Sequence, residues 1–188
     1  MKIWKSRLVV AGAVLLGAFA AFIGVQQWTG NIHAVIPGKL YRSATLGTGE
    51  FAHLLDREGI RTVINLRGPH VGLPWYDGER EATEERNVRL VDLSWSAGHE
   101  LTDNMVSQFY KAIEDAPQPI LIHCMSGADR TGLAVALFMA KMAKSTEAVA
   151  ESQLSIRYGH ISIPFLSSAY AMDETFERLE PSLGYYGS

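Results

Sequence analysis

The only cysteine of the chain, Cys124, stands in its most informative stretch, His-Cys-Met-Ser-Gly-Ala-Asp-Arg-Thr-Gly at residues 123–132. The apolar run before it predicts a buried strand, and the apolar residues 133–143 after it have helical spacing. A cysteine between a strand and a helix start faces converging N–H groups and the positive end of the helix dipole. Such a position and a nearby cation, here Arg130, lower a thiol pKa from its usual value of about 8.5. The spacing therefore indicates a thiolate nucleophile that attacks a phosphate.

The residues around this cysteine have predicted parts in that chemistry. The backbone N–H groups of five consecutive residues can curl around a tetrahedral anion: Met125, Ser126, Gly127, Ala128 and Asp129. Gly127 permits the backbone angles that such a curl needs. Arg130 offers a planar fork for two phosphate oxygens. Thr131 is expected to hydrogen-bond the thiolate, and His123 to orient the loop from behind.

This stretch resembles the signature loop of the cysteine-dependent protein tyrosine phosphatase superfamily, in which His precedes Cys-x5-Arg-Thr/Ser. Its Gly-x-Asp-Arg-Thr-Gly ending is most similar to the atypical dual-specificity phosphatases of bacteria, plants and fungi. Residues 35–44 resemble a strand and turn of that family, and residues 59–67 resemble its next helix-to-strand passage. The resemblance implies a hydrolase that forms a cysteinyl-phosphate without a metal or cofactor. Its expected partner is a phosphorylated protein, an inositol phosphate or a lipid head group.

Two other interpretations explain less of the stretch. A buried cysteine that merely packs accounts for Cys124 but not for Gly127, Arg130, Thr131 and Gly132 at their offsets. A rhodanese-like sulfur carrier also uses a loop cysteine before a helix, but the Arg-Thr-Gly ending suits phosphate better. A thiol redox protein is disfavoured because the cysteine has no Cys-x-x-Cys partner.

The general acid departs from the family pattern. Family members usually carry an aspartate on a loop that here corresponds to residues 95–101, and this loop contains none. An acid must come within about 3 Å of the leaving oxygen, directly or through one water. Sequence spacing places Asp129 near the phosphate, so it is favoured over Asp92, and Asp92 over His99 or Glu100. The missing aspartate also motivates an alternative, a catalytically weak phosphate-binding or sensor module.

Three further residues are candidates for supporting the site. Arg42 and Arg67 recur within the two upstream stretches and could fix the loop or the substrate. Asn65 could hydrogen-bond the loop from a neighbouring strand. Asp103 is assigned instead to a helix start because it follows Thr102 before an amphipathic run. Three aromatic residues near the expected rim are predicted to pack beneath their loops: Trp75, Tyr76 and Trp95.

The N-terminus predicts a membrane segment. Basic residues precede eighteen residues, Leu8 to Val25, that carry no charge. This length just spans a bilayer as a helix, and the basic flank favours a cytoplasmic N-terminus. Residues 1–30 are therefore expected to be a signal anchor, or alternatively a signal peptide cleaved after Ala18-Phe-Ala20. Either places the domain of residues 31–188 outside the cytoplasm, in a bacterium in the periplasm or on the outer surface.

Composition and pattern predict an α/β domain. A charge of −3 and a pI of about 6.1, with no basic stripe, argue against nucleic acid as a main ligand. Strands and helices alternate along the chain, which predicts a mostly parallel sheet of about four or five strands flanked by helices, preceded by an N-terminal hydrophobic helix. Ligands of such sheets bind at the carboxyl ends of the strands. No cluster of His, Cys, Asp or Glu in the sequence has metal-ligand spacing, so the sequence predicts no metal site.

Overall fold

Five short strands form the central sheet. The computed structural model describes residues 12–14, 17–22, 24–26 and 28–186. The strands lie in the order β1-β2-β5-β3-β4. β1 pairs with β2 antiparallel, and the other pairs are parallel. The strand bounds are β1 His33–Ile36, β2 Leu40–Ser43, β3 Thr62–Asn65, β4 Arg89–Asp92 and β5 Ile120–His123. The predicted α/β fold with a mostly parallel sheet is confirmed.

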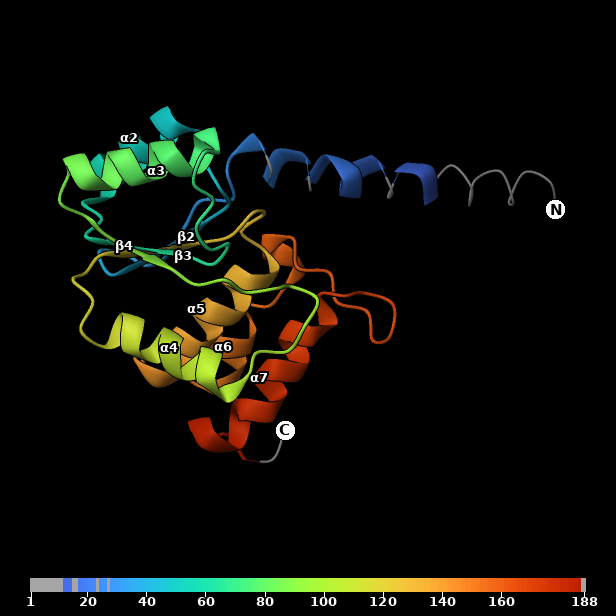
Figure 1. Ribbon diagram of the computed structural model, residues 1–188. Helices are drawn as coiled ribbons and strands as arrows, with labels where there is room; N and C mark the ends of the chain where they lie inside the picture. Colours follow the sequence, from blue (N-terminus) through green and yellow to red (C-terminus); the bar gives the residue numbers. More distant parts are fainter. Residues whose placement is uncertain (1–11, 15–16, 23, 27, 187–188) are drawn as a thin grey trace.

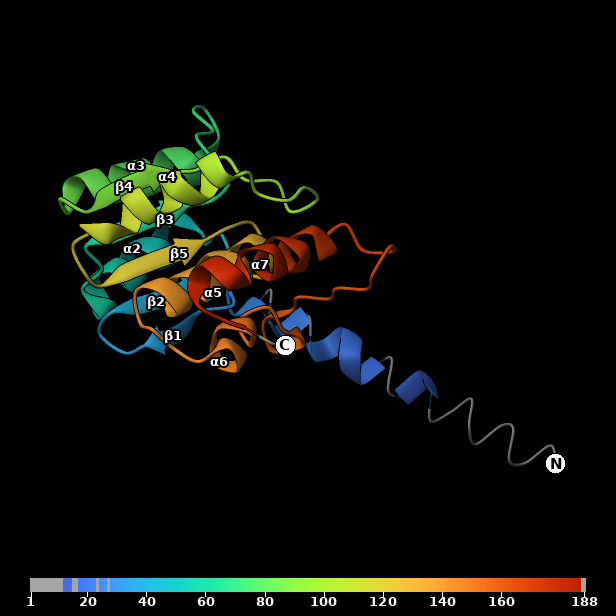
Figure 2. The same ribbon diagram turned by 90° about the horizontal axis from the view of Figure 1, so that it is seen from below.

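Helices cover both faces of the sheet (Figure 1). Helices α2 and α3 lie on one face, and α4 to α7 lie on the other, as the view from below also shows (Figure 2). Their bounds, with the short 3-10 helix η1, are α2 Thr48–Glu58, α3 Pro74–Glu85, α4 Asp103–Glu114, α5 Asp129–Lys141, α6 Glu147–Glu151, η1 Ile156–Tyr158 and α7 Tyr170–Leu183.

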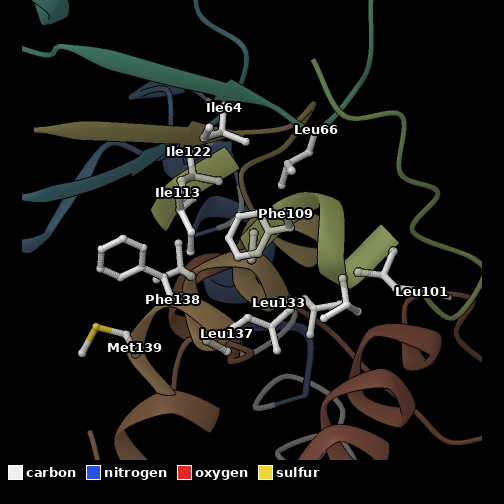
Figure 3. Packing of buried hydrophobic residues seen from close by; sticks show 14 of the residues in the cluster. Ile64, Leu66, Leu101, Phe109, Ile113, Ile122, Leu133, Leu137, Phe138 and Met139 are labelled. Atoms are coloured by element: carbon white, nitrogen blue, oxygen red, sulfur yellow. The ribbon is translucent and has the colours of Figure 1, made fainter. Parts of the chain in front are cut away.

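Alternation along the strands sends side chains to two hydrophobic cores. Val63 and Leu121 pack on the side of α2 and α3. Their neighbours Ile64 and Ile122 pack on the opposite side, against Phe109 of α4 and residues of α5 (Figure 3). The central strand β5 is fully buried. This two-sided burial explains why its sequence is an apolar run, and it makes β5 a firm support for the loop that follows it.

The predicted elements differ from the structure mainly at the two ends of the domain. The sequence of residues 31–41 predicts a linker and one strand, but this segment holds β1 and the start of β2, joined by a turn. The sequence predicts the last helix over residues 165–179, but the helix runs from Tyr170 to Leu183. The sequence also predicts a helix that starts after Ser145 or Thr146 and runs toward Ile156, but α6 ends at Glu151 and η1 follows separately. In the other segments the predicted and observed elements agree to within a few residues.

The predicted N-terminal hydrophobic helix falls partly outside the described residues. Residues 12–14, 17–22 and 24–26 are helical, while residues 1–11, 15, 16, 23 and 27 of the predicted segment 1–30 are not described. Within the described part of the chain, no helix has the length and apolar character needed to cross a membrane. The end of this segment contacts the domain, because Gln26 Nε2 donates to the carbonyl oxygen of Arg157.

Candidate active site

The loop predicted to bind phosphate connects the end of β5 to the first turn of α5. Cys124 lies at its floor with an exposed fraction of 1%. Gly127 has a φ of +72°, and a Cβ there would lie 2.7 Å from the backbone N of Ala44. Only glycine fits this position without strain, because the left-handed backbone and the close approach of β2 both exclude a side chain. The loop is therefore shaped both by its own residues and by the strand beside it.

Arg130, in the first turn of α5, is anchored on one edge of its guanidinium. Its Nη1 donates to the carbonyl oxygen of Trp95 at 3.2 Å and, more weakly, to that of Leu66 at 3.4 Å. Its Nε is buried and has no hydrogen-bond partner among the described residues. A buried N–H without an acceptor costs free energy, so this donor favours an incoming anion. Because Nη1 is anchored, the planar guanidinium is held in one orientation, and this fixes the direction in which the edge that carries Nε points.

The back of the loop is held by carbonyl contacts that leave its front open. The fully buried Arg42 of β2 donates through Nη2 to the carbonyl oxygens of Gly127, at 2.9 Å, and Ala128, at 3.3 Å. Its Nη1 donates to Gln153, and its guanidinium lies 3.7 Å from the ring centre of Tyr158. Burial lowers the pKa of Arg42 to about 10, so it stays charged at neutral pH. Arg42 thus fixes the loop, as expected.

Two residues that the sequence did not single out also hold the loop from outside. Asn31 Nδ2 donates to the carbonyl oxygens of Ser126, at 3.0 Å, and Tyr158, at 2.9 Å. Thr45 Oγ1 donates to the carbonyl oxygen of Cys124 at 3.0 Å. A loop whose carbonyls are engaged in this way can use its N–H groups to bind an anion.

His123 is paired behind the loop. Its Nε2 lies 2.7 Å from Oε1 of Glu79 on α3, and both side chains are buried. This partner was not predicted, but the arrangement agrees with an orienting part for His123. Thr131 differs from expectation: its Oγ1 is buried and forms no hydrogen bond within the described chain, to the thiol or to any other group. The expected bond between Thr131 and the thiolate is therefore absent.

Asp92 is committed to structural bonds. Its Oδ1 accepts from Asn65 Nδ2 at 2.7 Å, and its Oδ2 accepts from the hydroxyl of Tyr76 at 2.5 Å. Burial and this bond raise the pKa of Tyr76 to about 12. Asn65 also donates to the carbonyl oxygen of Gly68 and accepts from the N–H of Arg67, so these side-chain bonds do not reach the phosphate loop as expected. Both oxygens of Asp92 are occupied, which disfavours it as a free proton donor.

The remaining acid candidates lie in different surroundings. Glu100 forms an ion pair with Arg178, and His99 is exposed with its Nδ1 3.1 Å from Ser96 Oγ. Asp129 is the first residue of α5 and sits within the loop itself. Its Oδ1 lies 2.8 Å from Nδ1 of His160, a residue that the sequence gave no reason to select.

Arg67 lies at the rim of the site. Its Nη1 donates to Thr45 Oγ1 at 2.9 Å, and its guanidinium stacks 3.7 Å from the ring centre of Trp75. Burial and the charge of Arg130 lower the pKa of Arg67, while the charge of Cys124 acts in the opposite direction. Arg67 therefore adds a cation at the rim of the site, besides Arg42 and Arg130. Tyr76 and Trp95 are buried and Trp75 is half-buried, in agreement with their predicted packing.

A match to a family model identifies the group of proteins to which the chain belongs. The model that matches residues 18–164 describes a DSP-PTPase phosphatase fused to NAD+ kinase. The chain belongs to this phosphatase family. It is a cysteine-dependent hydrolase of the atypical dual-specificity type, as its loop predicted. Among the curated proteins, none matches the chain.

Solved structures share the fold of this phosphatase. TpbA from P. aeruginosa has 22% identity and a TM-score of 0.60, and the match covers 83% of this chain and 92% of TpbA. A Cys-to-Ser variant of TpbA has been solved in complex with pTyr, with 20% identity and a TM-score of 0.60 over 85% and 93% of the two chains. The PP-IP phosphatase SIW14 from S. cerevisiae has 19% identity and a TM-score of 0.58 over 84% and 94%. At these identities the matches establish the fold alone.

Proposed function

We propose that this phosphatase hydrolyses phosphate monoesters through a cysteinyl-phosphate at Cys124. The Sγ–P bond forms as the P–O bond to the leaving group breaks, and water then cleaves the Sγ–P bond and releases phosphate. Arg130 and the loop N–H groups hold the oxygens over which charge spreads. The observation that carries the proposal is the buried thiol below a loop whose arginine presents a buried, unpartnered Nε.

Asp129 is the general acid in this proposal. It protonates the leaving oxygen in the first step and takes a proton from the attacking water in the second. Its position inside the loop supports this role, and the occupied oxygens of Asp92 argue against the main alternative.

The proposed substrates are phosphotyrosine-type phosphoproteins or inositol phosphates, including phosphoinositide head groups. The complex of TpbA with pTyr supports the first class, and the activity named for SIW14, a PP-IP phosphatase, supports the second. Arg67 favours a substrate with a second anionic group, because it adds a cation beside the one that binds the reacting phosphate.

Phosphate release from a substrate panel tests this function. The full chain, in detergent and with its thiol reduced, would be assayed with an aryl phosphate, a phosphotyrosine peptide, a phosphoserine peptide, inositol hexakisphosphate and a phosphatidylinositol phosphate. We expect turnover that Cys124→Ser abolishes while phosphate binding is retained, because the hydroxyl is a far weaker nucleophile than a thiolate. Turnover that survives in Cys124→Ser would refute the mechanism. Phosphate binding without turnover on any substrate would instead indicate a sensor module.

We further propose that residues 8–25 anchor the phosphatase in a membrane, with its catalytic domain extracytoplasmic, or that the domain is exported after signal cleavage. Exposed apolar side chains on the described helical residues, including Phe19, Phe22 and Val25, support a lipid partner. So does the loop between η1 and α7, where Ile161, Ile163, Phe165 and Leu166 are exposed. This loop and the described part of the N-terminal segment lie on the same side of the domain in Figure 1 and in Figure 2.

A further inference from the structure

His160 bridges the phosphate loop to the last helix. It follows η1, and it is almost fully buried, with an exposed fraction of 4%. Its Nδ1 lies 2.8 Å from Oδ1 of Asp129, and its Nε2 lies 3.0 Å from Oδ2 of Asp173 on α7. Each ring nitrogen thus faces a carboxylate, one of which belongs to the proposed general acid. His160 lies outside the loop motif of residues 123–132 that characterises the family.

The surroundings of His160 favour its charged form. Burial lowers the pKa of the imidazole, but the hydrogen bonds that the ring donates to both carboxylates, and the charges of these carboxylates, outweigh it and raise the pKa to about 9. Burial likewise opposes ionisation of Asp173, while hydrogen bonds with His160 and Ser162 lower its pKa. At neutral pH the three side chains therefore hold a proton on the imidazole between two carboxylates. The charged groups that face the ring are Asp129 from α5 and Asp173 from α7.

An ionised Asp129 cannot by itself protonate a leaving group, so the acid proposed above needs a source of protons. We propose that His160 supplies this proton to Asp129 and recovers it afterwards, with Asp173 holding the ring in place. This inference rests on the proposed cysteinyl-phosphate mechanism and deepens it. His160 acts through Asp129 and is in this sense a positioning and proton-storing residue.

The proton balances over the two steps. In the first, the Nδ1 proton of His160 passes to Asp129, and the carboxyl group delivers it to the leaving oxygen as the P–O bond breaks. The oxygens of an aspartate exchange readily, because rotation about Cβ–Cγ is broad and roughly two-fold. The ring is then neutral, with its Nε2–H still donating to Asp173. In the second step Asp129 takes a proton from the attacking water and returns it to Nδ1, so the cycle closes.

Two substrates with different leaving groups distinguish this proton-supplying role of His160 from a merely structural one. 4-Nitrophenolate departs without protonation, whereas phenolate needs a proton from the enzyme. We expect His160→Gln to lower kcat/KM for phenyl phosphate about 10²-fold, in the range of general-acid effects, and to lower it far less for 4-nitrophenyl phosphate. Asp129→Asn should show the same pattern, and Asp173→Asn a weaker one. Glu174→Gln is the matched control, because Glu174 follows Asp173 in the sequence and its side chain is exposed.

The pH profile gives a second readout. Because the donor is the protonated ring, kcat for phenyl phosphate in the wild type should stay high below a pH of about 9 and fall above it. Asp173→Asn should move this fall to lower pH, since one of the two carboxylates that raise the pKa of His160 is lost. Equal losses on both substrates in His160→Gln and in Asp173→Asn, or an unmoved profile in Asp173→Asn, would overturn the relay. A wild type that is inactive on every substrate would refute the phosphatase mechanism instead.

Discussion

At the scale of single residues, Arg130 is the side chain whose geometry gives the clearest indication of phosphate binding. Its Nη1 is anchored on the carbonyl oxygens of Trp95 and Leu66, and its buried Nε lacks a protein acceptor. Lysine cannot keep this anchor and also present two parallel donors. We expect Arg130→Lys to lower kcat/KM for 4-nitrophenyl phosphate about 10²- to 10³-fold, comparable to the loss of one donor to a transition-state oxyanion.

The control for this substitution is Arg86→Lys, because Arg86 makes its ion pairs at the end of α3 with the exposed Asp56 and Glu85. That variant should keep wild-type kinetics. If Arg130→Lys stayed within about threefold of the wild type, the anchored fork would have no part in transition-state binding.

The single residues that sequence reasoning missed share a physical reason. Cys124, Asp129 and Arg130 lie within one short motif, where spacing alone brings them together. His160 is 31 positions beyond Asp129, and Glu79 is 44 positions before His123. Contacts of this kind depend on how helices pack on the sheet, and no local pattern encodes them. The expected bond from Thr131 to the thiol is absent for a related reason, because spacing places the hydroxyl near the loop but does not fix where it points.

At the scale of elements, the loop depends on the close approach of β2. Gly127 and Gly38 have nearly equal φ values, +72° and +73°, but a Cβ at Gly38 would meet nothing within 4 Å, whereas at Gly127 it would lie 2.7 Å from backbone atoms of Ser43 and Ala44. Gly38→Ala should therefore lower the free energy of unfolding by about 1–2 kcal/mol, the cost of the left-handed backbone alone.

Gly127→Ala carries the same backbone cost and an overlap worth about 1–3 kcal/mol more. Chemical denaturation of both variants measures the difference, and the phosphatase assay should show a loss of activity for Gly127→Ala only. Equal destabilisation of the two variants would mean that β2 can move away and that the loop does not depend on it.

Elements were predictable where one physical signal dominated. The apolar run of β5 and the buried face of α2, with Phe51, Leu54 and Leu55, give unambiguous patterns. The hairpin of β1 and β2 was harder, because β1 is an edge strand whose side chains are largely half-buried and therefore lack a clean alternation. The start of α7 was placed too early since residues 165–169 continue the apolar composition without forming a helix.

At the scale of the whole molecule, the sheet brings site residues from four of its strands to one edge. The loops that follow β2, β3, β4 and β5 contribute Thr45, Arg67, Trp95 and Cys124, as expected for the carboxyl ends of parallel strands. The apolar loop after η1 continues from His160, which contacts Asp129 of this same edge. A bilayer that held residues 8–25 and touched this loop would therefore lie close to the opening of the active site.

Lipid contact by this loop can be measured in the full chain reconstituted in vesicles that contain brominated lipid. Bromine quenches tryptophan fluorescence only at short range, so Phe165→Trp, at a side chain with an exposed fraction of 99%, should be quenched by the lipid. Met142→Trp is the matched control, since Met142 is also exposed but follows the far end of α5, about 20 Å along a helix of thirteen residues that starts at the loop. The four native tryptophans contribute the same background to both variants. If position 165 were quenched no more than position 142, the loop would face water and the proposed orientation of the domain on the membrane would be wrong.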